Sequence, residues 1–305
     1  MNKPDVSRRE ALIALGGAAG LMAGCAREDV GSGERLQLNL DDPTDLAYAR
    51  QKVRGSVVDE ELHSFMRFHF YGQEPGKKAV PLLSMNNYII HAWEPLEAGT
   101  YKLRHWEVGY YCEFDTDTPI ETWLNPITNE EIEVFHFVLG PIERVYSPEG
   151  VIAPGLAPIP LASHIMGPRF YLATQAISQI PNMFKPDEWP KRSSGEIINW
   201  VSMQTMSALW DDVTNPALNS APANIHLQNF VSWSSWMQMG DRPGGTMARA
   251  YGTEIAGFDA LEPDVLAAFK KYTPEIFETA TWDVTRFDEF DYFNLMQERR
   301  ARGEV

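Results

Sequence analysis

Apolar and polar residues alternate with a period of two through much of the chain. Between positions 63 and 71, Met66, Phe68 and Phe70 fall on one side of an extended backbone, and Phe65, Arg67 and His69 fall on the other. The alternation is clearest from 101 to 114, which predicts a long strand. Its apolar row is Trp106, Val108, Tyr110, Cys112 and Phe114, and its polar row is His105, Glu107, Tyr111 and Glu113.

Other segments give weaker signals. Acidic residues at Asp42 and Asp45 predict the start of a helix that runs to Val53, and a proline near its first turn predicts another helix over 263–272. The segment 196–210 fits either a strand or a helix. Further strands are expected over 120–124, 131–139, 225–233 and 246–253.

These patterns predict a mainly β fold, an antiparallel barrel-like or sandwich domain over 42–296 with long Pro-rich loops and a few short helices. The prolines between 154 and 190 predict a long irregular segment of the kind that often forms a lid. Residues 26–41 are expected to be a polar tether and 297–305 a charged, frayed tail. No repeat or flexible linker divides the chain.

Residues 1–25 have the order of an export signal. Arg8 and Arg9 precede an uncharged run from 11 to 24, which is shorter than the roughly 20 residues that a membrane-spanning helix needs. The arginine pair resembles a twin-arginine signal, which directs folded proteins to the export machinery. Small residues precede Cys25 as in a lipobox, so we expect a lipid anchor on the periplasmic side of the cell envelope. A buried N-terminal helix with a chance cysteine is the alternative.

Composition and charge narrow the partners. A net charge of −16 argues against nucleic acid, and 44% hydrophobic residues support a sizeable core. With Cys25 lipidated, Cys112 alone cannot form a disulfide within the chain. The sequence has no haem, metalloprotease, EF-hand or phosphate-loop motif, and its 7 histidines show no tight metal-ligand spacing. We therefore expect neither a cofactor nor a metal.

Two sets of residues are candidates for proton chemistry. His136 is either a buried imidazole bonded to the backbone or a general base inside a ligand cavity. The polar row of 101–114 is either the solvated face of a sheet or, in a barrel, the lining of a wet pocket. In such a pocket Glu107, next to His105 and Tyr111, would have a raised pKa and could move protons.

The loop 233–245 supplies candidates for ligand binding. Trp233, Trp236 and Met237 either plug the end of a barrel or stack on an apolar or aromatic ligand. Arg242 either pairs with an acidic neighbour or holds a carboxylate or phenolate of that ligand.

Four motifs together resemble one family. They are EVGYY at 107–111, WLNPIT at 123–128, VFH at 134–136 and WSSWMQMGDRPG at 233–244. Their order is similar to that of the domain of unknown function 1838 family, over roughly 35–295. The name implies little about activity, although members often carry similar export signals. Asn129 stands where the family pattern has a glycine, so we expect a residue with positive φ there.

The leading hypothesis is a cofactor-independent lyase or isomerase, acting outside the cytoplasm on a hydrophobic aromatic or terpenoid molecule. In it His136 acts as base or acid, Glu107 and Tyr111 relay protons, and Arg242 steadies negative charge. Trp123, Asn125, Trp233, Trp236 and Met237 would line the pocket, although Asn125 also suits a turn. The main alternative is a non-catalytic lipoprotein that binds a lipid or aromatic ligand, and a scaffold without a cavity is a third.

Overall fold

The computed structural model describes residues 34–97, 99–152, 159, 161–278 and 285–305. Residues 35–305 form one compact unit. The expected export signal, Cys25 and the first part of the expected tether lie outside the described residues. None of the helices in the described ranges is long and apolar enough to cross a membrane.

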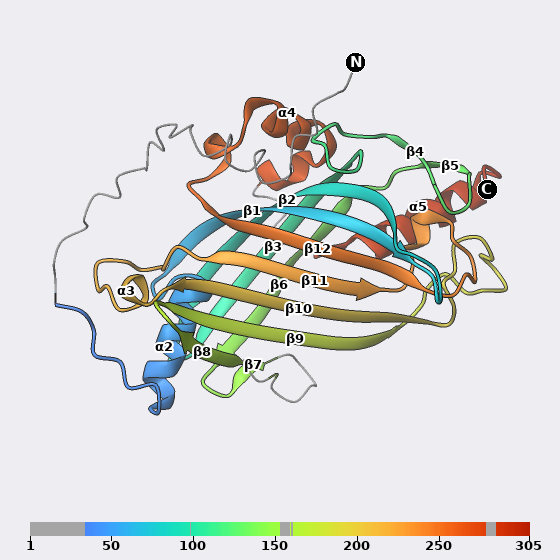
Figure 1. Ribbon diagram of the computed structural model, residues 1–305. Helices are drawn as coiled ribbons and strands as arrows, with labels where there is room; N and C mark the ends of the chain where they lie inside the picture. The colour runs from blue at the N-terminus through green and yellow to red at the C-terminus, as the bar shows by residue number, and fades with distance from the viewer. Residues whose placement is uncertain (1–33, 98, 153–158, 160, 279–284) are drawn as a thin grey trace, which may run out of the picture. The chain divides into compact units, whose positions relative to one another are not determined.

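An antiparallel sheet of 11 strands organises this unit. Its strands are β1 (Glu60–Gln73), β2 (Val80–Pro95), β3 (Tyr101–Cys112), β6 (Phe137–Ser147), β7 (Gly150–Ile152), β8 (Ala162–Met166), β9 (Arg169–Pro181), β10 (Ile197–Leu209), β11 (Asn224–Val231), β12 (Gly245–Ile255) and β13 (Arg286–Phe287). They pair in the order β13-β6-β3-β2-β1-β12-β11-β10-β9-β8, and β7 pairs with β6. A separate hairpin consists of β4 (Thr122–Leu124) and β5 (Glu131–Glu133). The large sheet curls into a half-barrel (Figure 1), which confirms the mainly β, antiparallel prediction.

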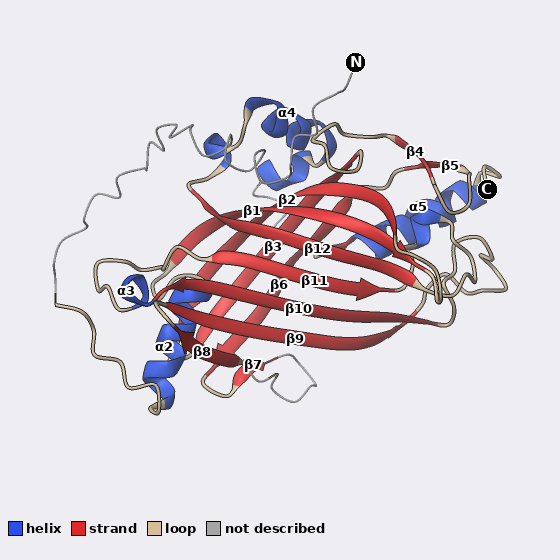
Figure 2. Cartoon of the chain, viewed as in Figure 1, coloured by secondary structure: helices blue, strands red, loops and turns tan. Residues whose placement is uncertain are grey.

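Four short helices accompany the sheet in the described ranges (Figure 2). They are α2 (Pro43–Arg54), α3 (Trp210–Val213), α4 (Pro263–Tyr272) and α5 (Asp288–Ala301), and the 3₁₀ turns are η1 (Ser235–Met237), η2 (Phe258–Ala260) and η3 (Pro274–Phe277). The side chain of Asp42 caps α2 by accepting the backbone N–H groups of Thr44 and Asp45, at 2.8 and 3.1 Å. This cap and the bounds of α4 agree with the sequence prediction.

The two faces of the sheet bury separate apolar clusters. Met66 and Phe68 of β1 share a cluster with Phe170 and Leu172 of β9. Because three strands separate β1 from β9, only the concave face can bring these side chains together. On the opposite, convex face, Tyr88 of β2 and Trp106 and Val108 of β3 form a second cluster with Phe269 of α4. The polar row of β3 therefore points toward the concave side, since its apolar row lies under α4.

Helices close the two ends of the concave face. At the end where β3 begins, Arg50 of α2 donates to the carbonyl of Leu161 at 2.7 Å, and Arg54 lies 3.9 Å from the centre of the Tyr146 ring. At the other end, Tyr292 of α5 packs against the ring of Phe184, with ring centres 5.6 Å apart. Both helices belong to the same concave cluster as the strands.

The secondary structure expected from the sequence was wrong in three segments. The Pro-rich segment contains β8 and β9, because Pro168 and Pro181 stand just before and at the end of β9, where a missing N–H costs little. The expected frayed tail begins inside α5, whose Tyr292 and Met296 are buried. The strand expected over 131–139 is interrupted at 134–136, between β5 and β6.

The segment 196–210, which the sequence left open between strand and helix, is almost entirely strand β10. The strands expected over 225–233 and 246–253 are confirmed as β11 and β12. Asn129 has φ 58°, the positive value expected from its place in the turn between β4 and β5.

Candidate functional site

A chain of hydrogen-bonded polar side chains lies on the concave face of β2 and β3. His91 Nε2 is 2.9 Å from His105 Nδ1, and His105 Nε2 is 3.1 Å from a carboxylate oxygen of Glu107. The amide of Asn87 donates to the other Glu107 oxygen at 2.9 Å. The side chains of His105 and Glu107 keep only 11% and 14% of their surface exposed. These four side chains therefore form a largely buried polar network within an otherwise apolar face.

Strand register places these residues side by side. His91 of β2 is directly opposite His105 of β3, and alternation puts Asn87 and Glu107 on the same face. A bulge between His105 and Glu107 shifts the pairing of β3 with β6. Gly140 makes this bulge possible, because its φ is 111° and a Cβ there would lie 2.5 Å from the His105 carbonyl oxygen.

Two acidic residues at the start of α5 lie next to this network. Phe287 pairs with Leu139 of β6, and Leu139 is itself opposite Glu107. The next residue, Asp288, is therefore close to Glu107. Burial, followed by the charges of Glu289 and Glu107, raises the pKa of Asp288 to about 8. Asp288 is thus mostly a neutral carboxylic acid at pH 7.

Glu289 is also withdrawn from water. One of its carboxylate oxygens accepts the backbone N–H of Ser235 in η1 at 3.2 Å. Burial raises the pKa of Glu289 above its ordinary value. The start of α5 thus adds two poorly solvated carboxyl groups to the concave face.

The hydrogen bonds determine where the imidazoles can carry protons. Burial, followed by the charges of His105 and Arg144, holds the pKa of His91 well below its usual range, so its ring is neutral at pH 7. With Glu107 ionised, His105 donates from Nε2 and must accept at Nδ1 from His91 Nε2. His91 then presents an unprotonated Nδ1, which bonds to no residue in the described part of the chain. This nitrogen is a candidate general base.

Aromatic rings that were predicted as site residues lie beside the carboxyl groups. Tyr111 is buried, and its ring centre is 5.1 Å from that of Trp236, which is 5.9 Å from that of Trp123. Burial, followed by the charges of Asp288 and Glu289, raises the pKa of Tyr111 far above 10. Tyr111 is therefore a neutral hydroxyl next to the carboxyl pair, and the three rings offer an apolar wall.

The other predicted pocket residues hold loops together. Trp233 donates its indole N–H to the Arg242 carbonyl at 3.1 Å. The carboxamide of Asn125 accepts the backbone N–H of Ile127 at 2.9 Å and donates to the carbonyl of Met237 at 3.2 Å. Asn125 is thus a turn former that ties the β4–β5 hairpin to η1. Trp233 and Met237 are both buried in the concave cluster.

The structure does not bring His136 together with Glu107. His136 lies in the segment before β6, and its Nδ1 accepts the backbone N–H of Tyr111 at 3.2 Å. Its ring packs against Tyr272 of α4, 4.7 Å between centres, and stacks on the Tyr111 ring, 6.3 Å between centres. Burial lowers the pKa of His136 to about 4. The expectation of one cavity shared by His136 and Glu107 was wrong, because β6 starts one residue after His136.

Arg242 is also away from the carboxyl network. It lies in the loop between η1 and β12, and its side chain is 41% exposed. Its guanidinium is 3.7 Å from a carboxylate oxygen of Glu74. This matches the alternative in which Arg242 pairs with an acidic neighbour. Glu113 follows the end of β3 and is exposed, so it does not extend the inward polar row.

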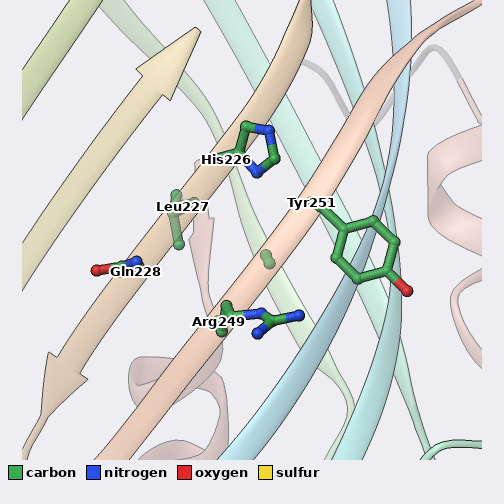
Figure 3. Close-up of a pocket in the computed structure, with 6 residues that line it drawn as sticks. His226, Leu227, Gln228, Arg249 and Tyr251 are labelled. Carbon is green, nitrogen blue, oxygen red and sulfur yellow. The ribbon is translucent and has the colours of Figure 1, made fainter. Parts of the chain in front are cut away.

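A separate pocket of about 410 Å³ lies on the convex side of β11 and β12 (Figure 3). Its polar lining is His226, Gln228, Arg249 and Tyr251. No acidic side chain is among the described residues that line it. It therefore lacks the combination of acid and base found on the concave face.

Sequence reasoning missed Asn87, His91, Asp288 and Glu289. The first two lie on β2, whose central residues are buried on both faces, so apolar and polar residues do not alternate there. Asp288 and Glu289 begin a helix that reads as an ordinary charged segment. Only the pairing of β13 with β6 shows that this segment turns inward.

No group of three or more His, Cys, Asp or Glu side chains in the described ranges is arranged to hold a metal ion. Among curated proteins, no sequence matches this chain. Residues 65–294, which contain the β3 network and the start of α5, match the model of one family, described as protein of unknown function (DUF1838). The chain therefore belongs to the domain of unknown function 1838 family.

Proposed function

We propose that this protein is a cofactor-independent enzyme that moves protons on a hydrophobic small molecule, as a lyase or an isomerase. The observation that carries the proposal is the buried network from His91 through His105 to Glu107, with Asp288 close to its Glu107 end. The pKa of the His91 imidazole is lowered and that of the Asp288 carboxyl group is raised. Neighbouring groups whose pKa values are pushed apart are the usual sign of an acid and base pair.

The roles follow from the protonation states. His91 Nδ1 takes a proton from the carbon or oxygen of the substrate, and His105 with Glu107 stabilises the resulting imidazolium. Asp288 gives its proton to another atom of the substrate. In an isomerase that atom is a carbon of the same molecule, and in a lyase it is the leaving group. Tyr111 and Trp236 pack against the apolar body of the substrate.

A binding lipoprotein is the second candidate, and one observation favours it. Outside the polar network the concave face is lined by apolar and small side chains, including Phe68, Ala248 and Ala250. Such a face suits retention of an apolar molecule without chemistry.

We further propose that the protein acts on the periplasmic side of the cell envelope, held by a lipid on Cys25. The support is the order of Arg8, Arg9, the uncharged run and Cys25 in the sequence. Globomycin-sensitive processing that disappears in Cys25→Ala is the expected result. Processing that is the same in both chains would leave a protein without the anchor.

Solvent isotope incorporation tests the enzyme against the binder. The purified protein is incubated in D₂O with an organic-solvent extract of cells that carry it, and the extract is analysed by mass spectrometry. A proton-transfer enzyme gives a product, or a compound with deuterium on carbon, that His91→Gln and Asp288→Asn do not give. A binder retains a compound without any deuterium, and that result would refute the enzymatic proposal. Circular dichroism of both variants controls for folding.

A further inference from the structure

The concave network contains hydrogen-bond acceptors that lack donors. Asn87 is fully buried and its amide points at Glu107, yet its carbonyl oxygen Oδ1 has no partner. The second carboxylate oxygen of Glu289, Oε2, is buried and equally without a partner. A buried acceptor without a donor is costly and uncommon in folded proteins. A ligand that donates hydrogen bonds would satisfy such an acceptor.

Negative charge also exceeds positive charge at this place. Asp288 lies close to both Glu289 and Glu107, and the charges that raise its pKa are those of Glu289, Glu107 and Asp291. The nearest arginine of the same segment, Arg286, is already bound to Asp291 at 2.8 Å and to Glu275 at 2.9 Å.

Arg144 of β6 also lies on the concave face. It is opposite Leu103 of β3, and its side chain is exposed. Its charge acts on the pKa of His91 and is not among those that act on Asp288 or Glu289. Asp288 and Glu289 therefore have no cationic partner in the described part of the chain.

We infer that the molecule bound on the concave face carries a protonated amine on an apolar body, with the ammonium group among Glu107, Asp288 and Glu289. This names the substrate class of the proposed function and uses the same site. An ammonium group has three donors, so it can reach unpartnered acceptors and a carboxylate together. The rings of Tyr111 and Trp236 beside the carboxyl groups can stabilise the cation through their π faces.

Charge preference follows from this arrangement. An organic anion would add a further negative charge to a poorly solvated acidic site, which is strongly unfavourable. A neutral alcohol could donate one hydrogen bond but would leave the carboxyl groups uncompensated. An amine should therefore bind best among molecules of the same shape.

The test uses three probes with one apolar body: 2-phenylethylamine, 2-phenylethanol and phenylacetate. Binding to the purified protein is measured by isothermal titration calorimetry at pH 7. We expect the amine to bind at least about tenfold more tightly than the alcohol, and phenylacetate not to bind. Asp288→Asn with Glu289→Gln should abolish the preference for the amine.

Glu113→Gln serves as the matched control, because Glu113 follows the same strand as Glu107 and is exposed. It should keep the amine preference unchanged. Equal affinities for the amine and the alcohol, or a preference for phenylacetate, would overturn the inference. Deuterium incorporation without amine preference would leave the proposed enzyme standing and remove only its substrate class. Amine preference without deuterium incorporation would leave the amine as the bound ligand and remove the proposed enzyme activity.

Discussion

Glu107 joins two strands through its side chain, because it accepts hydrogen bonds from His105 of its own strand and from Asn87 of β2. The amide of Asn87 also donates to the carbonyl of Val108 at 3.2 Å. His105 in turn orients His91. One carboxylate therefore fixes the tautomers of two imidazoles, and its loss should affect proton transfer more than packing.

Replacement of Glu107 by Gln tests this dependence. The amide of Gln has one acceptor oxygen where the carboxylate has two, and it cannot balance an imidazolium on His105. We expect the rate of deuterium incorporation to fall about 10²-fold or more, while retention of the same compound changes little. Rates are followed by mass spectrometry in D₂O. Glu113→Gln is the control, and an equal loss of rate in both variants would contradict the role of Glu107.

His136 makes a different prediction, which concerns stability and pH. Its folded pKa of about 4 is lower than its ordinary value, so the unfolded chain binds a proton between pH 6.5 and 4 that the folded chain does not. Stability should therefore be lost as the pH falls through this range, by roughly 3 kcal/mol. The measurement is urea unfolding at several pH values from 4.5 to 7.5.

The variant His136→Asn isolates this effect. Its side-chain oxygen can take the place of Nδ1 as acceptor for the Tyr111 N–H, but it does not titrate. Stability of His136→Asn should depend less on pH than that of the parent. His164→Asn, which changes an exposed histidine of β8, should keep the parental dependence. If both variants keep it, His136 is not the group responsible.

At the scale of elements, α2 is the helix whose boundary the sequence specified best. Asp42 accepts two backbone N–H groups of its first turn, so Asp42→Ala should destabilise the protein by about 1 kcal/mol. Asp41→Ala is the neighbouring control and should change stability by less than about 0.5 kcal/mol. Denaturant midpoints measure both. Equal midpoints for Asp42→Ala and the parent would show that packing of α2 alone determines its stability.

Strands could be predicted where one face is polar and the other apolar. In β3, Trp106 and Val108 alternate with His105 and Glu107. In the structure the two apolar residues lie on one face of the sheet, under α4, and the two polar residues lie on the other. In β2 both faces are buried, so its central residues give no alternation and the strand was not predicted. β9 was hidden because prolines flank a strand with an exposed outer face, where Ile177 is 74% exposed.

The candidate site could be predicted only in part, for reasons of the same kind. Glu107 and Tyr111 come from a strand with a clear alternation and share its concave face, and the Tyr111 ring lies 5.1 Å from that of Trp236. His136 was misplaced because the pattern continues through 131–139 although the chain leaves the hairpin at 134. Which face of β3 would be concave depends on how the sheet curls, and no local pattern encodes that. Asp288 needed the pairing of β13 with β6, a contact between distant segments.

For the molecule as a whole, the arrangement of buried groups is consistent with a protein that folds before export. Residues 35–305 form one unit, and the sequence contains only 2 cysteines, Cys25 and Cys112. Cys112 is fully buried at the end of β3 within the cluster that α4 covers. Folding of this unit therefore requires no disulfide, and it can be complete in a reducing compartment.

Cys112 also reports on opening of the whole unit. Burial raises the pKa of its thiol to about 12, so the reactive thiolate is both scarce and shielded in the folded protein. In a chain carrying Cys25→Ser, Cys112 is the only thiol, and we expect its labelling by a disulfide reagent to be at least about 10³-fold slower than in the unfolded chain. Labelling should accelerate with urea in parallel with loss of the circular dichroism signal, because release of Cys112 requires α4 to leave the sheet. A labelling rate that stays fast and independent of urea would mean that α4 and the end of β3 open on their own, and the unit would then not unfold as one.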